Sequence, residues 1–96
     1  MIIEQALLQV RPGQDDAFRQ AMATARPLIA ASPGFIDLQV RPAPEEPGCY
    51  LLLVHWESIA DHRDGFRRSD RYQQWRALLH GFYDPMPQVR YFGDPL

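Results

Sequence analysis

Residues 49–56, Cys49-Tyr50-Leu51-Leu52-Leu53-Val54-His55-Trp56, decide the fold of this chain. Five consecutive residues, from Tyr50 to Val54, are apolar, so the alternation expected of a strand with one solvated face is missing. An unbroken apolar run of this length after a Pro-Gly turn is typical of a β-strand that is covered on both faces. A sheet must therefore form around this strand, and both of its faces must be covered.

Three other segments are predicted to be strands. Residues 2–10 are extended with apolar side chains on both faces, residues 35–41 alternate strictly, and residues 88–92 form a short last strand. Pro-rich residues 42–48 form an exposed connection, because proline cannot donate to a central strand. The apolar side chains expected to share one face of each strand are Ile2, Ala6, Leu8 and Val10, then Ile36, Leu38 and Val40, and then Val89 and Tyr91.

Apolar residues at helical spacing predict helices between these strands. A first helix starts near Asp15 and Asp16, whose carboxylates suit the positive end of a helix dipole. A second helix follows Ser58 as N-cap, and a third restarts at Ser69 and ends at Asp84-Pro85. The apolar faces are Phe18, Met22, Ala25 and Ile29 in the first helix, Ile59, His62 and Phe66 in the second, and Tyr72, Trp75, Leu79 and Phe82 in the third.

The order strand, helix, strand, strand, helix, strand predicts an α+β, ferredoxin-like split βαβ fold. Its four-stranded antiparallel sheet carries helices on one face. The two-faced apolar strand then needs a cover on the other face, and a like subunit is the commonest partner. We therefore expect residues 1–96 to form a single domain that assembles as a homodimer.

Composition excludes several classes of function. The 96 residues, 11.1 kDa, carry a net charge of −2, and all ten basic residues are arginines, so lysine chemistry is absent. Neither a membrane span nor a signal peptide is legible, and we expect the cytoplasm as the compartment. The single cysteine and three dispersed histidines match no metal-site spacing, and there is no dinucleotide fingerprint, so we expect neither metal nor cofactor.

Arginines 63, 67 and 71 form a stripe at helical spacing that could contact nucleic acid. Asp61, Asp64 and Asp70 are interleaved with them. Mixed charges at this spacing favour a solvated helix face, and no nucleic-acid binding is expected.

Four short motifs, in this order, resemble the antibiotic biosynthesis monooxygenase (ABM) domain family. They are the Pro12-Gly13 turn with Phe18 after it, the junction Ser32-Pro33-Gly34-Phe35, the strand from Tyr50 ending in Trp56-Glu57-Ser58, and the segment Phe66-Arg67-Arg68-Ser69. The resemblance implies a dimeric α/β barrel with a pocket between sheet and helices in each protomer. It also implies oxidation of a small phenolic or quinol substrate with O₂, without flavin or metal.

Such an oxygenation needs a base, because a phenolate, unlike the phenol, readily passes an electron to O₂. His62 and His80 are the candidate bases, since imidazole titrates near neutrality. His62 is slightly preferred as the base, because it shares an apolar helix face where desolvation keeps it neutral. A histidine in such a place is nevertheless more often a hydrogen-bonded packing residue than a catalyst. His80 stands near a helix C-terminus, where the dipole is expected to hold it protonated as a cap. His55 alternates with Trp56 and should face the dimer interface.

Aromatic side chains and one arginine complete the predicted site. Tyr72 matches a family position that could hydrogen-bond a phenol, and Trp56 matches the family's strand tryptophan. The pocket walls are expected from Trp56, Phe66, Trp75 and Phe82, although Trp56 can equally be a core residue, and Trp75 and Phe82 can be core residues too. Arg90 could donate to an anion, although an ion pair is the simpler role for it.

Two other functions remain open. In a haem-binding or haem-degrading relative, His80 would be the axial ligand. The relatives that degrade haem pair this histidine with an asparagine and a tryptophan, and this chain has no asparagine, which argues against degradation by that route. The second of these functions is that of a dimeric ligand-binding domain without turnover.

Overall fold

Four antiparallel strands form one sheet in the order β2-β3-β1-β4. The computed structural model describes residues 1–96, and its elements follow the predicted order. They are β1 (Ile2–Gln9), α1 (Asp15–Ala30), β2 (Phe35–Pro42), β3 (Cys49–Trp56), the π-helical turn η1 (Asp61–Phe66), α2 (Asp70–Leu79), the 3₁₀ turn η2 (His80–Phe82) and β4 (Arg90–Phe92). This arrangement confirms the ferredoxin-like split βαβ fold.

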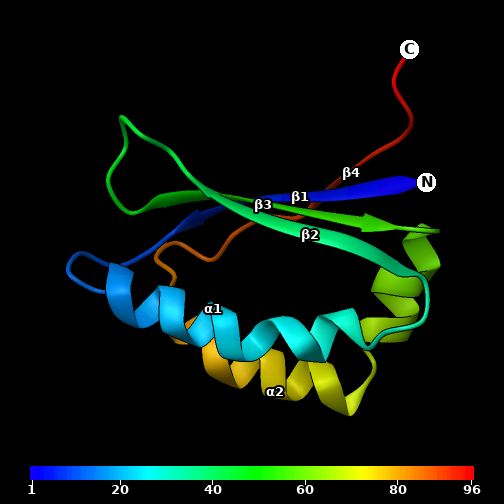
Figure 1. Cartoon of the computed structure of the whole chain (residues 1–96), viewed down its shortest axis with the longest axis horizontal. Coiled ribbons are helices and arrows are strands. Elements are labelled where there is room, and N and C mark those ends of the chain that lie inside the picture. Colours follow the sequence, from blue (N-terminus) through cyan, green and yellow to red (C-terminus); the bar gives the residue numbers. More distant parts are fainter.

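Both long helices lie against the same face of the sheet, where α1 packs beside α2 (Figure 1). The inward residues of β1 and β3 alternate along each strand and are almost fully buried; they include Ala6, Leu8, Val54 and Trp56. They meet the predicted apolar face of α1, Phe18, Met22, Ala25 and Ile29, all of which is buried. No helix is both long and apolar enough to cross a membrane.

The opposite face of the sheet has no cover within the chain. Leu7 is 52% exposed and Phe92 is 49% exposed there, and Leu51 and Leu53 are only half-buried. His55 points to this face as predicted, and its Nδ1 lies 3.9 Å from Asp37 Oδ2. One chain therefore covers β3 on one side only.

Strand β2 differs from its predicted alternation at its start. Phe35 pairs with Trp56, but Asp37 already pairs with His55, so Ile36 is the extra residue of a β-bulge. Ile36 is consequently 45% exposed, whereas Leu38 is buried. The prediction that Ile36 shares the core face is wrong, because the bulge interrupts the two-residue period.

The last helix is shorter than predicted. Its N-cap is confirmed, since Ser69 Oγ accepts a hydrogen bond of 3.2 Å from the Tyr72 amide. However, α2 ends at Leu79, and the tighter turn of η2 carries the chain to Tyr83. This change of pitch rotates Phe82 away from the face of Trp75 and Leu79.

Candidate functional site

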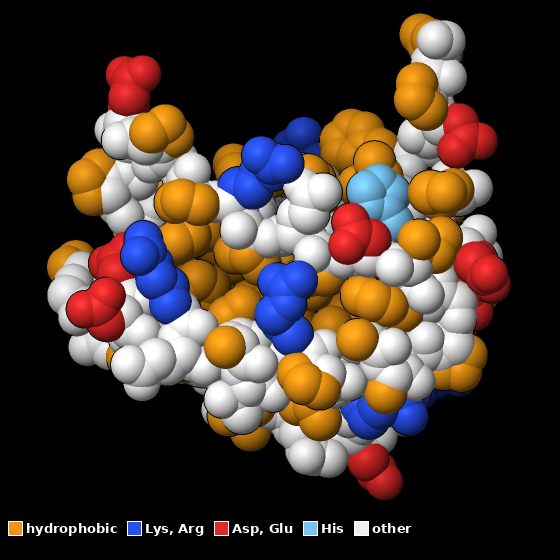
Figure 2. Space-filling view, in the orientation of Figure 1, with side chains coloured by type: hydrophobic (Ala, Val, Ile, Leu, Met, Phe, Trp, Pro, Cys, Tyr) orange, Lys and Arg blue, Asp and Glu red, His pale blue; other side chains and the backbone are white.

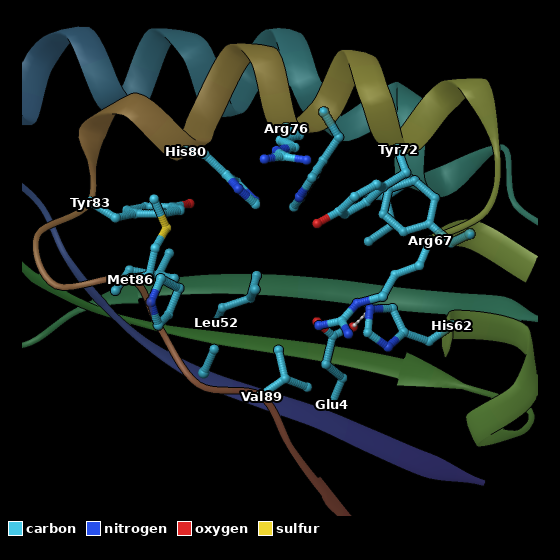
Figure 3. A pocket seen from close by; sticks show the side chains of 16 residues that line it. Glu4, Leu52, His62, Arg67, Tyr72, Arg76, His80, Tyr83, Met86 and Val89 are labelled. Atoms are coloured by element: carbon cyan, nitrogen blue, oxygen red, sulfur yellow. Dashed lines mark ion pairs between the residues drawn. The ribbon is translucent and has the colours of Figure 1, made fainter. Parts of the chain in front are cut away.

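A cavity of about 340 Å³ lies between the sheet and the helices η1 and α2 (Figure 3). Its floor is formed by inward residues of β1 and β3, including Ala6, Leu8 and Leu52. Phe66, Trp75 and Val89 supply further apolar wall. This volume is at the lower end of the range of roughly 300–1,000 Å³ found for ligand pockets, so it suits a small ligand.

A buried polar cluster closes the sheet side of the cavity. The imidazole of His62 lies between Tyr91 Oη, 2.6 Å from Nδ1, and Glu4 Oε1, 3.3 Å from Nε2. The indole Nε1–H of Trp56 donates to the same Glu4 oxygen over 3.0 Å. Both ring nitrogens of His62 are therefore engaged by the protein.

Burial governs the protonation of this cluster. Desolvation raises the pKa of Glu4 to about 7, against the opposing effects of the Trp56 hydrogen bond and the Arg67 charge. Desolvation, helped by Arg67, lowers the pKa of His62 to about 4. His62 is thus neutral at physiological pH, as predicted from its apolar surroundings.

The π-helical turn explains how His62 comes to face the cavity together with two later residues. The amide of Arg67 donates to the carbonyl of His62, five residues back, over 3.0 Å. This wider turn puts Phe66 and Arg67 in the cavity lining together with His62. The turn is held at its start by Ser58, whose Oγ accepts from the Asp61 amide at 3.2 Å.

His80 enters the cavity from the end of α2, and Figure 3 shows its ring pointing inward near Tyr83. Neither ring nitrogen has a hydrogen-bond partner in the protein. Desolvation, together with the charges of Arg76 and Arg67, lowers the pKa of His80. The expected protonation by the helix dipole is therefore wrong: burial and two cationic neighbours outweigh the dipole, and the helix continues past His80 as η2.

The predicted site residues divide into two groups. The structure brings His62, Phe66, Tyr72, Trp75 and His80 together around one cavity. Trp56, Phe82 and Arg90 are not among its lining.

Each of the three excluded residues has a structural reason. Trp56 is fully buried behind the wall, where it holds Glu4. Phe82 turns toward α1 and meets Phe18 edge to face at 5.8 Å. Arg90 is on β4 and pairs with Gln5 of β1. Its neighbour Tyr91 points inward, so the side chain of Arg90 is exposed on the open sheet face.

Four functional residues were missed from the sequence: Glu4, Arg67, Arg76 and Tyr91. Glu4 had a detectable signal, because it lies between Ile2 and Ala6 on the inward face of β1, where a carboxylate is unusual. Arg67 is exposed, as expected for the solvated stripe, and the π turn also places it in the cavity lining. Arg76 and Tyr91 carried no comparable signal.

The chemistry available in this cavity is that of proton transfer in apolar surroundings. The neutral imidazole of His80, whose nitrogens have no partner in the protein, lies edge to face with the ring of Tyr72 at 6.1 Å. Arg67 and Arg76 bring positive charge to the same lining. The chain contains no group of three or more His, Cys, Asp or Glu side chains that could hold a metal ion.

The split βαβ fold and the cavity between sheet and helices place the chain in a class of small α+β proteins. Comparison with known proteins identifies the family within this class. The family model described as antibiotic biosynthesis monooxygenase (ABM) matches residues 1–78, and the chain belongs to this family. The uncharacterized protein YczJ of Bacillus subtilis (strain 168) is 44% identical over 94 residues, which are 98% of this chain and 99% of that protein.

Solved structures agree with this assignment. A candidate antibiotic biosynthesis monooxygenase from Bordetella bronchiseptica is 34% identical, with a TM-score of 0.94 over 99% of this chain and 97% of that one. SnoaB from Streptomyces nogalater, a cofactor-independent oxygenase, has a TM-score of 0.86 over 99% of this chain and 93% of its own. SnoaB is only 14% identical, so this likeness shows the shared fold alone.

Proposed function

We propose that this protein is a cofactor-independent monooxygenase that oxidises a small phenolic or quinol substrate with O₂. The observation that carries the proposal is the ring of His80, which is neutral, free of protein partners and directed into an aromatic cavity. Membership of the ABM family and the fold shared with an oxygenase support it.

His80 accepts the phenolic proton in this proposal. His62 is the weaker of the two predicted bases, because Glu4 and Tyr91 already engage both of its nitrogens. Tyr72 donates a hydrogen bond to the oxygen that becomes negative, and the apolar wall limits the water that would otherwise stabilise the resting phenolate.

The oxidation balances without a reductant. The phenolate gives one electron to O₂, and the resulting substrate radical and superoxide combine to form a C–O bond. His80 returns the phenolic proton to this peroxide. The O–O bond then breaks as the carbon loses its hydrogen, leaving a carbonyl on the substrate and releasing water. The substrate supplies all four electrons that O₂ takes up, and one oxygen atom enters the product.

We also propose a homodimer that buries the open sheet face. Leu7, Leu51 and Leu53 lie together there, since Leu7 pairs with Leu51 in the β1–β3 register. Exposed apolar side chains in the middle of a sheet are unusual for a monomer and typical of an interface. A second copy would give β3 the second cover that its sequence requires.

Oxygen consumption with a panel of dihydroxynaphthalenes and anthrones tests the catalytic proposal. His80→Ala should lower kcat by about 10²- to 10⁴-fold, which is the usual contribution of a general base. His55→Ala is the matched control, because it removes a histidine from the opposite face of β3. The control should retain full activity once its oligomeric mass has been shown to be unchanged.

Three results would contradict the proposal. Equal turnover by wild type and His80→Ala would show that His80 is not the base, and the His62→Ala variant then identifies or excludes the other candidate. No reaction of wild type with the panel would favour a ligand-binding domain without turnover. A stoichiometric, His80-dependent Soret shift on haem titration would favour the haem-binding alternative.

A further inference from the structure

Two arginines line the cavity without a counterion. Arg67 follows the π turn and Arg76 lies on α2. Neither guanidinium has an ion pair or a side-chain hydrogen bond within the chain, although Arg11 pairs with Asp84 on the surface. Both side chains are exposed, so water solvates them, and they present two positive charges to one small cavity.

Their arrangement directs the positive charge inward. In Figure 3, Arg76 lies on the α2 side, between His80 and Tyr72, and the side chain of Arg67 extends toward Glu4 and His62. Arg67 influences the pKa values of Glu4, His62, His80 and Tyr91. By contrast, the neighbouring Arg63 and Arg68 do not line the cavity.

The cavity has no anion that could neutralise both arginines. Glu4 is the only acidic residue of the lining, and it already accepts from Trp56 and contacts His62. Its pKa of about 7 also leaves it partly protonated at neutral pH. Both histidines of the lining are neutral there, so the cavity as a whole is positive.

The apolar walls of the cavity indicate the shape and polarity of the rest of the ligand. The floor of Leu8 and Leu52 and the rings of Phe66 and Trp75 suit a flat apolar body. About 340 Å³ holds a small ring system with a single acidic substituent. A guanidinium fork matches the two oxygens of a carboxylate, and it binds them more strongly than it binds a neutral oxygen.

We propose that the substrate of this protein is an aromatic acid, a phenol or quinol bearing a carboxylate that Arg67 and Arg76 hold at the cavity. This inference deepens the proposed function and rests on it for the fate of the ligand, but not for its binding. The arginines hold the acidic group, and this contact keeps the aromatic ring in the cavity that His80 lines. Substrates with the same ring but no acid bind more weakly.

Anaerobic calorimetry with two matched probes tests this inference, because ligand cannot then be consumed by O₂. The probes are 6-hydroxy-2-naphthoate and 2-naphthol, which differ only in the carboxylate. Wild type should bind the naphthoate at least about tenfold more tightly. Arg67→Gln and Arg76→Gln should each remove much of this preference without changing the affinity for 2-naphthol, and the double variant should remove it entirely. Arg68→Gln, an adjacent exposed arginine outside the lining, is the matched control and should keep it.

Equal affinity of wild type for the two probes, no measurable binding of the naphthoate, or a preference that survives in the double variant would overturn the inference. Oxygen consumption measured separately distinguishes it from the proposed function. A naphthoate preference without oxidation of either probe leaves the anion site standing and counts against the monooxygenase. Oxidation of 2-naphthol without a naphthoate preference supports the monooxygenase and counts against the anion site.

Discussion

His62 and Glu4 form a buried pair that has the geometry of an ion pair and the protonation of a neutral one. Nε2 of His62 lies 3.3 Å from Oε1 of Glu4, and both side chains are almost inaccessible. Desolvation raises the pKa of the acid to about 7 and lowers that of the base to about 4. The proton therefore stays on the carboxyl group below neutrality, because neither charge is well solvated at this site.

The pKa shifts of Glu4 and His62 have opposite signs, so their effects on the pH dependence of folding stability should cancel. The raised pKa of Glu4 contributes stability that is full below its unfolded value of 4.5 and is lost as the pH rises toward about 7. The lowered pKa of His62 contributes stability that is full above 6.5 and is lost as the pH falls toward about 4. Between pH 4.5 and 6.5 the two contributions compensate each other.

Urea unfolding of single variants at fixed protein concentration separates the two contributions. Relative to wild type, Glu4→Gln should gain stability as the pH rises from 4.5 to 6.5, and His62→Gln should lose it. Each change should be on the order of 3 kcal/mol at most. Parallel pH curves for wild type and both variants would show that the pair titrates normally.

Trp56→Phe should destabilise the fold through Glu4. The indole of Trp56 is fully buried and donates to Glu4 over 3.0 Å, so its loss leaves a poorly satisfied carboxyl group. We expect a cost of about 1–3 kcal/mol in the free energy of unfolding, and a still higher pKa of Glu4. Trp75→Phe is the control, since it removes a similar volume with no indole hydrogen bond to Glu4. A pH dependence altered equally by both variants would contradict this role.

The rate of oxidation should fall only in acid. A base must be unprotonated, and the pKa of His80 lies below its usual value of 6.5, so kcat/KM should remain level at neutral pH and decline below 6.5. Arg76 contributes to the low pKa, and Arg76→Gln should move this decline to higher pH. Arg68→Gln should leave it in place. An unchanged pH profile for Arg76→Gln would count against His80 as the titrating base.

Gly34→Ala should disturb the π turn that carries His62. Gly34 has a φ of +82°, and a Cβ there would collide with the side chain of Asp61, which Ser58 holds at the start of the turn. A cost of about 1–3 kcal/mol is expected. Gly81→Ala meets nothing within 4 Å and should cost less. Equal melting temperatures for the two variants would show that Asp61 can move aside freely.

Leu7→Asp should break the proposed homodimer. Leu7 is 52% exposed on the open sheet face, so a monomer can tolerate the carboxylate there, whereas an apolar interface cannot. Light scattering on a sizing column should give about twice the chain mass for wild type and the single chain mass for the variant. Gln20→Asp, on the exposed side of α1, should remain dimeric. A monomeric wild type would refute the dimer.

Local sequence patterns were enough to predict the element order, most of the inward faces and the general place of the cavity. Regular periods carry this information locally: Phe18, Met22, Ala25 and Ile29 lie on one helix face whatever the partner is. The apolar run from Tyr50 to Val54 likewise identified a central strand, and β3 lies between β2 and β1 in the sheet.

The contacts between polar groups could not be predicted in this way, because they depend on how distant segments pair. Trp56 and Glu4 are 52 residues apart, and their hydrogen bond depends on the register between β1 and β3. The bulge at Ile36 and the π turn before Arg67 each change a period by a single residue, which redirects one side chain without altering the pattern around it. The protonation of His80 depends on burial and on two arginines brought near by folding, so the helix position alone gave the wrong sign.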